Sequence, residues 1–282
     1  MATVVTTPAR PAVTPSRPIS KLLAVWHLLS LDAPCVAALW TIFFARSFDV
    51  ALPWAAPAAL ALAVWMLYVL DRTADAAAGH EALAERHHFH HNHRSAFIGT
   101  VLGAVPALAL LIALLPSALR TAWLLLALPL AIYVAAVHIL RLRRLPKEHL
   151  VALFFSVATM MPVVASRSVA AARLIPAMAA FGAICWLNCI AIVRWEHTPP
   201  STLDSVTAWS AAHFRDVIIA VLLAMLPSIP WQPEIAITCA ASALLLLLLE
   251  NTRPRPSATT LRALADAVLL TPLVVLPFLR PR

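Results

Sequence analysis

Charged residues are scarce in this chain, and their scarcity excludes the class of water-soluble globular proteins. Asp, Glu, Lys and Arg make up 12% of the 282 residues, whereas 62% are hydrophobic and the mean hydropathy is +0.85. A soluble domain keeps about a quarter of its residues charged, because its surface must face water. With so few charges, the remaining outer surface must face lipid, and we expect an integral membrane protein.

Glycine and cysteine are also rare, which argues against helix packing through GxxxG motifs and against a disulfide framework. The four glycines are too few for GxxxG packing to be the main means of helix contact, so alanine must allow close approach. The four cysteines lie in apolar runs without CxxC spacing, which indicates buried thiols rather than a disulfide framework.

Long apolar runs are abundant, and they predict an all-α, polytopic membrane bundle of about nine transmembrane helices. Each run is long enough, or nearly so, to cross the hydrocarbon layer as a helix. Strands are excluded because the runs are continuous rather than alternating. The expected spans are 24–45, 52–70, 96–115, 119–140, 149–166, 174–193, 215–230, 233–250 and 261–279.

The distribution of basic residues predicts the orientation and localisation. The chain has 21 Lys and Arg against 13 Asp and Glu. Most of the cations fall on one side if the N-terminus is cytoplasmic and the C-terminus outside. The excess charge is therefore explained by topology, and no nucleic-acid motif accompanies it. An Ala-, Arg- and Pro-rich composition favours a bacterial inner membrane.

We expect two regions. Residues 1–20 are rich in Pro, Thr and Ser and lack an apolar core, which predicts a disordered cytoplasmic tail rather than a signal peptide. Residues 21–282 form a single transmembrane domain. Its two longest inner loops, 71–95 and 194–214, are where chemistry is expected, because loops carry most functional residues.

The first acidic segment follows the second expected span. Asp71 and Asp75 are four residues apart, so both carboxylates project from one side if the helix continues. Two carboxylates at this spacing suit Mg²⁺, which commonly binds one or two carboxylates together with phosphate oxygens. The structural alternative is an interfacial helix cap, with Asp71 paired to a cation such as Arg72.

A second segment ends the sixth expected span, 121 residues further along the chain. It holds Asn188 and Glu196, which are eight residues apart and so lie on one helical face. Both segments begin with a tryptophan and have an acid ten residues later, which hints at an internal duplication. A hydrogen bond between helices explains Asn188 nearly as well as a ligand role does, and Glu196 is equally explained as a surface charge.

These features together resemble the UbiA superfamily of intramembrane prenyltransferases. Its members have nine helices, a cytoplasmic N-terminus and Asp-rich motifs after the second and sixth helices. Asp71 and Asp75 match the acids of the first motif, while its Asn falls at Leu67. In the second motif Asn188 and Glu196 match the outer positions, while the middle acid falls at Ile192.

The resemblance implies the activity and its ligands. Such a protein transfers an isoprenyl group from its diphosphate to a hydrophobic acceptor in the membrane lipid. Asp71, Asp75 and Glu196 would hold Mg²⁺, and Asn188 would complete the catalytic set. Cations would stabilise the departing diphosphate, and the candidates are Arg72, Arg94, Lys147 and Arg194.

The first inner loop also contains a histidine-rich stretch, which keeps other functions open. Six of the 11 histidines lie in residues 80–93. Imidazole is a common ligand of transition metals, so a metal-handling membrane protein is one alternative. A loop that covers the diphosphate and a solvated loop without a role are two others. A further rival is a catalytically inactive relative with a binding or structural role.

Three polar residues in the apolar runs carry separate expectations. We expect His27 and Asp32 to lie at the membrane interface. Asp266 lies about five residues inside the last expected span and should face the bundle interior or a cavity. It is a secondary site candidate, with a structural hydrogen bond as the alternative.

Overall fold

The computed structural model describes residues 18–77, 89, 91–138, 146–196, 203–252 and 257–279, and within these ranges the chain is helical throughout, without strands. The helices are α1 (Pro18–Leu28), α2 (Asp32–Ser47), α3 (Ala55–Ala77), α5 (Arg94–Ala113), α6 (Ser117–His138), α7 (Lys147–Ser166), α8 (Ala171–Trp195), α9 (Ser205–Ala212), α10 (Phe214–Met225), η2 (Leu226–Ser228), α11 (Pro233–Asn251), α12 (Ala258–Ala267), η3 (Val268–Leu270), α13 (Pro272–Val275) and η4 (Leu276–Phe278).

Seven helical segments in the described part of the chain are long and apolar enough to cross a membrane. They correspond to α3, α5, α6, α7, α8, α11 and the segment from Thr260 to Phe278. An eighth span results if α9 and the segment Phe214–Ser228, bent by 95° relative to each other, are counted as one. The chain is therefore a helical membrane protein, as its composition predicts.

The predicted count of about nine spans is not confirmed, for reasons that are local. The expected first span, 24–45, is divided between α1 and α2 by a turn at Ser30, where φ is 58°. The expected seventh span, 215–230, falls in α10, which is only 12 residues long. Neither segment is a straight helix of full transmembrane length.

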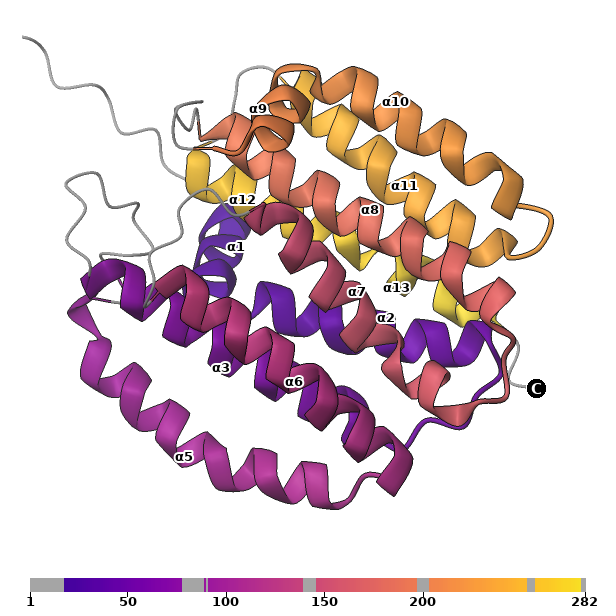
Figure 1. Cartoon of the computed structure of the whole chain (residues 1–282). Helices are drawn as coiled ribbons and strands as arrows, with labels where there is room; N and C mark the ends of the chain where they lie inside the picture. The colour runs from indigo at the N-terminus through magenta and orange to yellow at the C-terminus, as the bar shows by residue number, and fades with distance from the viewer. Residues whose placement is uncertain are drawn as a thin grey trace, which may run out of the picture.

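The helices form an elongated bundle with α5 at one edge and α10 at the other (Figure 1). α2, α7 and α8 occupy the middle, where the largest apolar side chains are packed. Trp40 stacks on Phe181 with ring centroids 4.1 Å apart, and its indole nitrogen donates to the Leu269 carbonyl at 2.7 Å. These contacts join α2, α8 and the last span, because a buried indole N–H needs an acceptor.

The outer helices are exposed to a degree that only lipid explains. In the apolar stretch of α6 no residue is buried, and in that of α5 only 11% of the residues are buried. Leu102, Leu125 and Leu128 are each more than half exposed. Such an apolar surface has no place in water but matches the hydrocarbon interior of a bilayer.

Both acidic segments lie at one end of the bundle. The C-terminal ends of α3 and α8 lie there, together with the starts of α7 and α12 and the short helix α9 (Figure 1). The fold therefore brings both predicted acidic segments to one side of the membrane domain.

Candidate functional site

A buried polar cluster lies near this end of the bundle. We define it as His27, Ser30, Asp32, Arg72, Asn188 and Asp266, which come from α1, the turn that follows it, α2, α3, α8 and α12. Asp32 is completely buried, His27 is 2% exposed, and Arg72 and Asn188 are each 6% exposed. Charged groups in such surroundings require partners, and the contacts below supply them.

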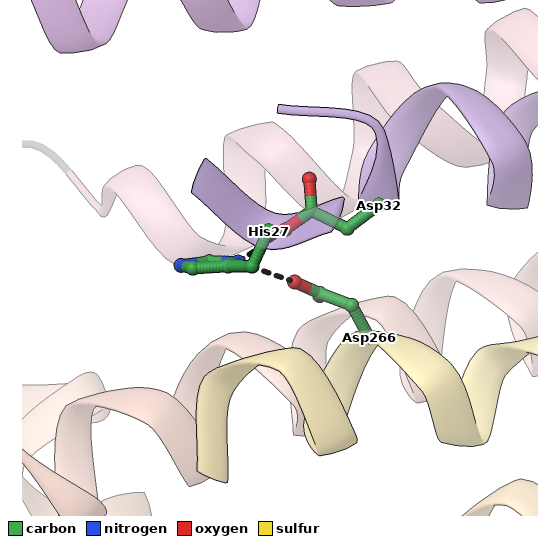
Figure 2. Close-up of side chains that lie close together, drawn as sticks. All are labelled: His27, Asp32 and Asp266. Atoms are coloured by element: carbon green, nitrogen blue, oxygen red, sulfur yellow. Dashed lines mark hydrogen bonds and ion pairs between the residues drawn. The ribbon is translucent and has the colours of Figure 1, made fainter. Parts of the chain in front are cut away.

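The turn between α1 and α2 places His27 against Asp32. The Ser30 N–H donates to the His27 carbonyl at 3.0 Å, and the Leu31 N–H donates to the Trp26 carbonyl at 3.1 Å. With Ser30 at positive φ, this is the pattern of a Schellman helix ending. It reverses the chain so that His27 Nδ1 lies 2.5 Å from Asp32 Oδ2. Figure 2 shows the two side chains close together.

Arg72 connects this turn to α3. Its Nη1 donates to the His27 carbonyl at 2.7 Å and to Ser30 Oγ at 2.8 Å, while its Nη2 lies 3.6 Å from Asp32 Oδ2. The planar guanidinium can serve several acceptors at once, which the single ammonium of lysine does less well. Arg72 thus holds the turn and partly balances the Asp32 charge.

Asn188 and Asp266 complete the cluster from the other side. Asn188 Nδ2 donates to Asp266 Oδ1 at 2.8 Å, and Asp266 Oδ2 lies 4.0 Å from His27 Nδ1. Figure 2 shows the His27 ring near both carboxylates. The prediction that Asp266 faces the bundle interior is confirmed. Helices α3 and α8, which carry the two acidic segments, are therefore linked through one set of polar contacts.

Both tyrosines of the protein are half-buried and lie near acidic side chains of this region. The Arg72 guanidinium carbon lies 5.8 Å from the centroid of the Tyr68 ring, and Tyr68 interacts electrostatically with Asp32 and Asp266. Tyr133 on α6 interacts electrostatically with Asp71 and Glu148. Polar groups of α3, α6, α7 and α12 therefore share one region of the bundle.

The structure places the predicted site residues in different surroundings. Asp71 is exposed near the end of α3, directly before the buried Arg72. The side chain of Asp75 lies outside the described part. Arg94 and Lys147 are exposed at the first residues of α5 and α7.

The two residues of the second segment both face α12, as their spacing predicts. Asn188 contacts Asp266, and both carboxylate oxygens of Glu196 accept from the Arg262 guanidinium. Glu196 is thus engaged in a two-point ion pair rather than standing as a plain surface charge. Arg262 neutralises it and fixes the end of α8 to α12.

Arg194 also has a structural partner. Its Nε and Nη2 donate to Glu250 Oε1 at 3.0 and 2.9 Å, and its Nη1 donates to the Ala211 carbonyl at 2.7 Å. The other Glu250 oxygen accepts from the Trp195 indole at 2.7 Å. Glu250 is 2% exposed, so this network joins α8 to α9 and α11 in a protected position.

His27 and Asp32 are both buried within the bundle, and the expectation that they lie at the membrane interface stays a prediction. Sequence reasoning treated the first span as one helix and so missed the turn that folds His27 back onto Asp32. The sequence carries no evident signal for this turn.

The histidine-rich stretch contributes little to the described structure. His91 and His93 are exposed, and His93 Nδ1 lies 2.9 Å from the Phe89 carbonyl oxygen. The predictions for His80, His87, His88 and His90 concern positions outside the described residues.

An apolar cavity of about 380 Å³ lies between α7 and α8. Leu153 and Ile175, which line it, are more than half exposed, so it opens toward lipid. At one place the cavity is bordered by His149 and Trp186, whose ring centroids are 5.1 Å apart. His149 Nδ1 and Trp186 Nε1 have no hydrogen-bond partner among the described residues.

Comparison with models of known protein families, with curated proteins and with solved structures finds no match for this chain.

Proposed function

We propose that this membrane protein is a divergent relative of the UbiA superfamily that transfers an isoprenyl group from its diphosphate to a lipid-soluble acceptor. The observation that carries the proposal is that one polar cluster links α3 to α8. Their acidic segments are 121 residues apart in sequence, yet Arg72 and Asn188 join one polar cluster through Asp32, His27 and Asp266.

The diphosphate would bind at the end of the bundle, beside this cluster. Asp71 is exposed there and acts electrostatically on the same tyrosine as Glu148, which neighbours Lys147 at the start of α7. Asp71, with Asp75 one turn further on, is the pair we assign to Mg²⁺. Carboxylate oxygens suit this ion, which commonly completes its coordination with water and phosphate.

The ion pair of Glu196 changes its assigned role. Because Arg262 occupies both oxygens, Glu196 fits a positioning role better than direct metal binding. Arg194, held by Glu250, fits the same role. Of the four cations predicted to contact the diphosphate, Lys147 and Arg94 are the two that are exposed at the described end of the bundle.

The cavity between α7 and α8 suits the isoprenyl chain. Its volume of about 380 Å³ lies in the usual range of small-molecule sites. Its border at His149 is two residues from Lys147, so a chain lying there places its diphosphate near the cationic end. Gly182 lines this cavity, and a Cβ at that position would lie 3.2 Å from Ser156 Oγ.

The reaction breaks the bond between the allylic carbon and the diphosphate oxygen, and it forms a bond from that carbon to the acceptor, which releases a proton. Mg²⁺, when bound, stabilises the negative charge of the leaving diphosphate. The bundle supplies cations and excludes water from the allylic centre. We place the N-terminus in the cytoplasm and the protein in a bacterial inner membrane, because basic residues gather on the side of the acidic segments.

The proposal can be tested by measuring diphosphate release. The purified protein in lipid nanodiscs is given Mg²⁺, isoprenyl diphosphates of increasing length and a panel of aromatic acceptors. Asp71→Asn and Asp75→Asn should each lower the rate at least about a hundredfold. Asp216→Asn, which changes an exposed acid on α10, is the matched control and should not. Equal rates in all four proteins, or no release with any chain length, contradict the proposal.

The chain-binding role of the cavity has its own test. Gly182→Leu fills space beside Ser156 and should weaken binding of the isoprenyl diphosphate. Gly103→Leu is the control, because a Cβ there meets nothing within 4 Å. Similar affinities for the two variants would place the isoprenyl chain elsewhere.

Two observations favour the second candidate, an inactive relative with a binding role. The second segment lacks the middle acid at Ile192, and Glu196 is committed to Arg262. Such a protein binds an isoprenoid lipid without turnover. Tight binding of the isoprenyl diphosphate that is independent of Mg²⁺, without diphosphate release, is the result that selects it.

A further inference from the structure

Within the polar cluster, three metal-ligating side chains converge from different helices. The ligand atoms of His27, Asp32 and Asp266 all lie within 4.8 Å of one another. They come from the end of α1, the start of α2 and the end of α12, and Figure 2 shows the imidazole near both carboxylates. None of these three residues belongs to the acidic segments assigned to the diphosphate.

A fourth polar atom adjoins these three. The Oδ1 atom of Asn188 is buried and has no hydrogen-bond partner among the described residues. The Nδ2 atom of the same side chain donates to Asp266, so the amide oxygen lies beside the cluster. A buried carbonyl oxygen without a donor is costly, and a cation would satisfy it.

The charges of the cluster leave a place for a cation. Two carboxyl groups face one guanidinium among its described residues, so with a neutral imidazole the net charge is minus one unless the cluster also holds a proton or a cation. A buried, uncompensated charge is strongly unfavourable. A divalent ion would reverse the sign of this charge, and a metal-bound hydroxide would then restore neutrality.

We propose that His27, Asp32 and Asp266 bind a single first-row transition-metal ion of the Zn²⁺ or Mn²⁺ class, with the Asn188 oxygen as a further ligand. One imidazole nitrogen with two carboxylates and an amide oxygen suits these ions better than Mg²⁺, which prefers oxygen throughout. Binding replaces the hydrogen bond between His27 and Asp32 by two bonds to the metal. The imidazole would stay neutral, because its proton would move from Nδ1 to Nε2, and the proton released to solvent would come from the metal-bound water.

The surroundings of the site support this role. Arg72 holds the turn by its bonds to the His27 carbonyl and to Ser30, which fixes the direction of the imidazole. Such supporting contacts orient metal ligands in known sites. The bound metal would tie the α1–α2 turn to α12, and its role is structural whether or not the protein transfers isoprenyl groups.

The test uses the full chain, stripped with a chelator and reconstituted in nanodiscs without any diphosphate. To remove competing sites, the loop histidines His80, His87, His88, His90, His91 and His93 are first changed to Gln. Zn²⁺ or Mn²⁺ should bind with a stoichiometry of about one and raise the unfolding temperature, whereas Mg²⁺ should not. Elemental analysis and thermal unfolding measure these outcomes.

Variants locate the ion. His27→Gln and Asp266→Asn should each weaken binding at least tenfold, while His213→Gln and Asp216→Asn, both at exposed positions, should leave it unchanged. If a cluster variant does not fold, the pulsed electron paramagnetic resonance spectrum of Mn²⁺ on the parent protein decides, because a histidine ligand gives nitrogen coupling.

Two results overturn the proposal. One is the absence of Zn²⁺ or Mn²⁺ binding once the loop histidines are replaced, which shows that a proton neutralises the cluster. The other is binding that the His27 and Asp266 variants leave intact. Because no diphosphate is present, neither result depends on whether the protein transfers isoprenyl groups.

Discussion

The guanidinium of Arg72 on α3 lies 3.6 Å from the carboxylate of Asp32 at the start of α2, measured from Nη2 to Oδ2. Both side chains are buried. This pair connects the turn after α1 with the helix that carries the first acidic segment. The position of that segment therefore depends on a buried ion pair and not only on apolar packing.

Replacement of Arg72 should destabilise the fold strongly. Arg72→Met removes the cation beside Asp32 and the donors to His27 and Ser30, and loss of one partner of a buried pair typically costs about 3–5 kcal/mol. Arg72→Lys should recover part of this, because one ammonium cannot reproduce the same set of bonds. Reversible unfolding in detergent micelles measures the differences.

The matched control for Arg72 is Arg215→Met. Arg215 is exposed on α10 and donates to Asn251 at 2.7 Å. Exposed polar pairs contribute at most about 1 kcal/mol. Equal losses of stability for the two variants would show that the burial of Arg72 does not matter.

Two substitutions at Ser30 separate the effect of its hydrogen bond from the effect of its backbone strain. Its φ of 58° favours glycine, while its hydroxyl accepts from Arg72. Ser30→Ala loses the hydrogen bond and keeps the backbone strain, whereas Ser30→Gly loses the same bond and relieves the strain. Unfolding experiments should show Ser30→Gly to be more stable than Ser30→Ala by about 1 kcal/mol. The opposite order would contradict the Schellman turn.

The fold class could be predicted from the sequence because lipid exposure leaves a strong compositional record. Helices α5 and α6 face lipid on most sides, so their sequences are continuously apolar and their bounds nearly match those expected, 96–115 and 119–140. The break at Ser30 was not predicted, because a serine in an apolar run carries no evident signal for positive φ. The bend between α9 and α10 was not predicted either, because residues 194–214 were expected to form an inner loop.

The site was predicted only in part. The spacing of Asn188 and Glu196 correctly placed both on one face, because helical periodicity is local information. Their partners Asp266 and Arg262 are 78 and 66 residues away in sequence, and helix spacing does not reveal which distant side chain a residue meets. The burial of His27 and Asp32 likewise depends on how α1 packs against α12.

Replacement of Glu250 should also lower the stability of the fold. Glu250→Gln removes the charge that balances Arg194, while its amide oxygen can still accept one of the bonds from Arg194 and Trp195. We expect a loss of about 1–3 kcal/mol in the free energy of unfolding, measured in micelles. Glu234→Gln in the first turn of the same helix is the control and should have a smaller effect. A neutral result for Glu250→Gln would contradict the network described for α8, α9 and α11.

The Asp204 cap should make the stability of α9 depend on pH. Its carboxylate caps α9 by accepting from the Val206 and Thr207 N–H groups at 3.0 and 3.1 Å. Partial burial acts to raise the pKa of Asp204, but hydrogen bonds from Thr207 and Val206 outweigh it, so the pKa lies below its ordinary 3.8. The stabilisation is therefore fully present above the ordinary pKa and is lost as the pH falls through the lowered one.

Two variants test this cap. Asp204→Ala should cost about 1 kcal/mol near neutral pH, whereas Asp204→Asn should keep the cap without a titrating charge. Hydrogen exchange of the α9 amides, followed as the pH is lowered, should show extra opening below about pH 4 in the wild-type protein but not in Asp204→Asn. Identical pH profiles for both proteins would rule out a role for the Asp204 charge.

The central claim is that the ends of α3 and α8 form one site for an isoprenyl diphosphate and Mg²⁺. The most direct measurement is the unfolding temperature of the purified protein with Mg²⁺ and isoprenyl diphosphates of the common chain lengths, each alone and together. We predict a rise that requires both ligands, reaches its maximum at one chain length and disappears in Asp71→Asn. An unfolding temperature that stays constant across all chain lengths, with or without Mg²⁺, would contradict the claim.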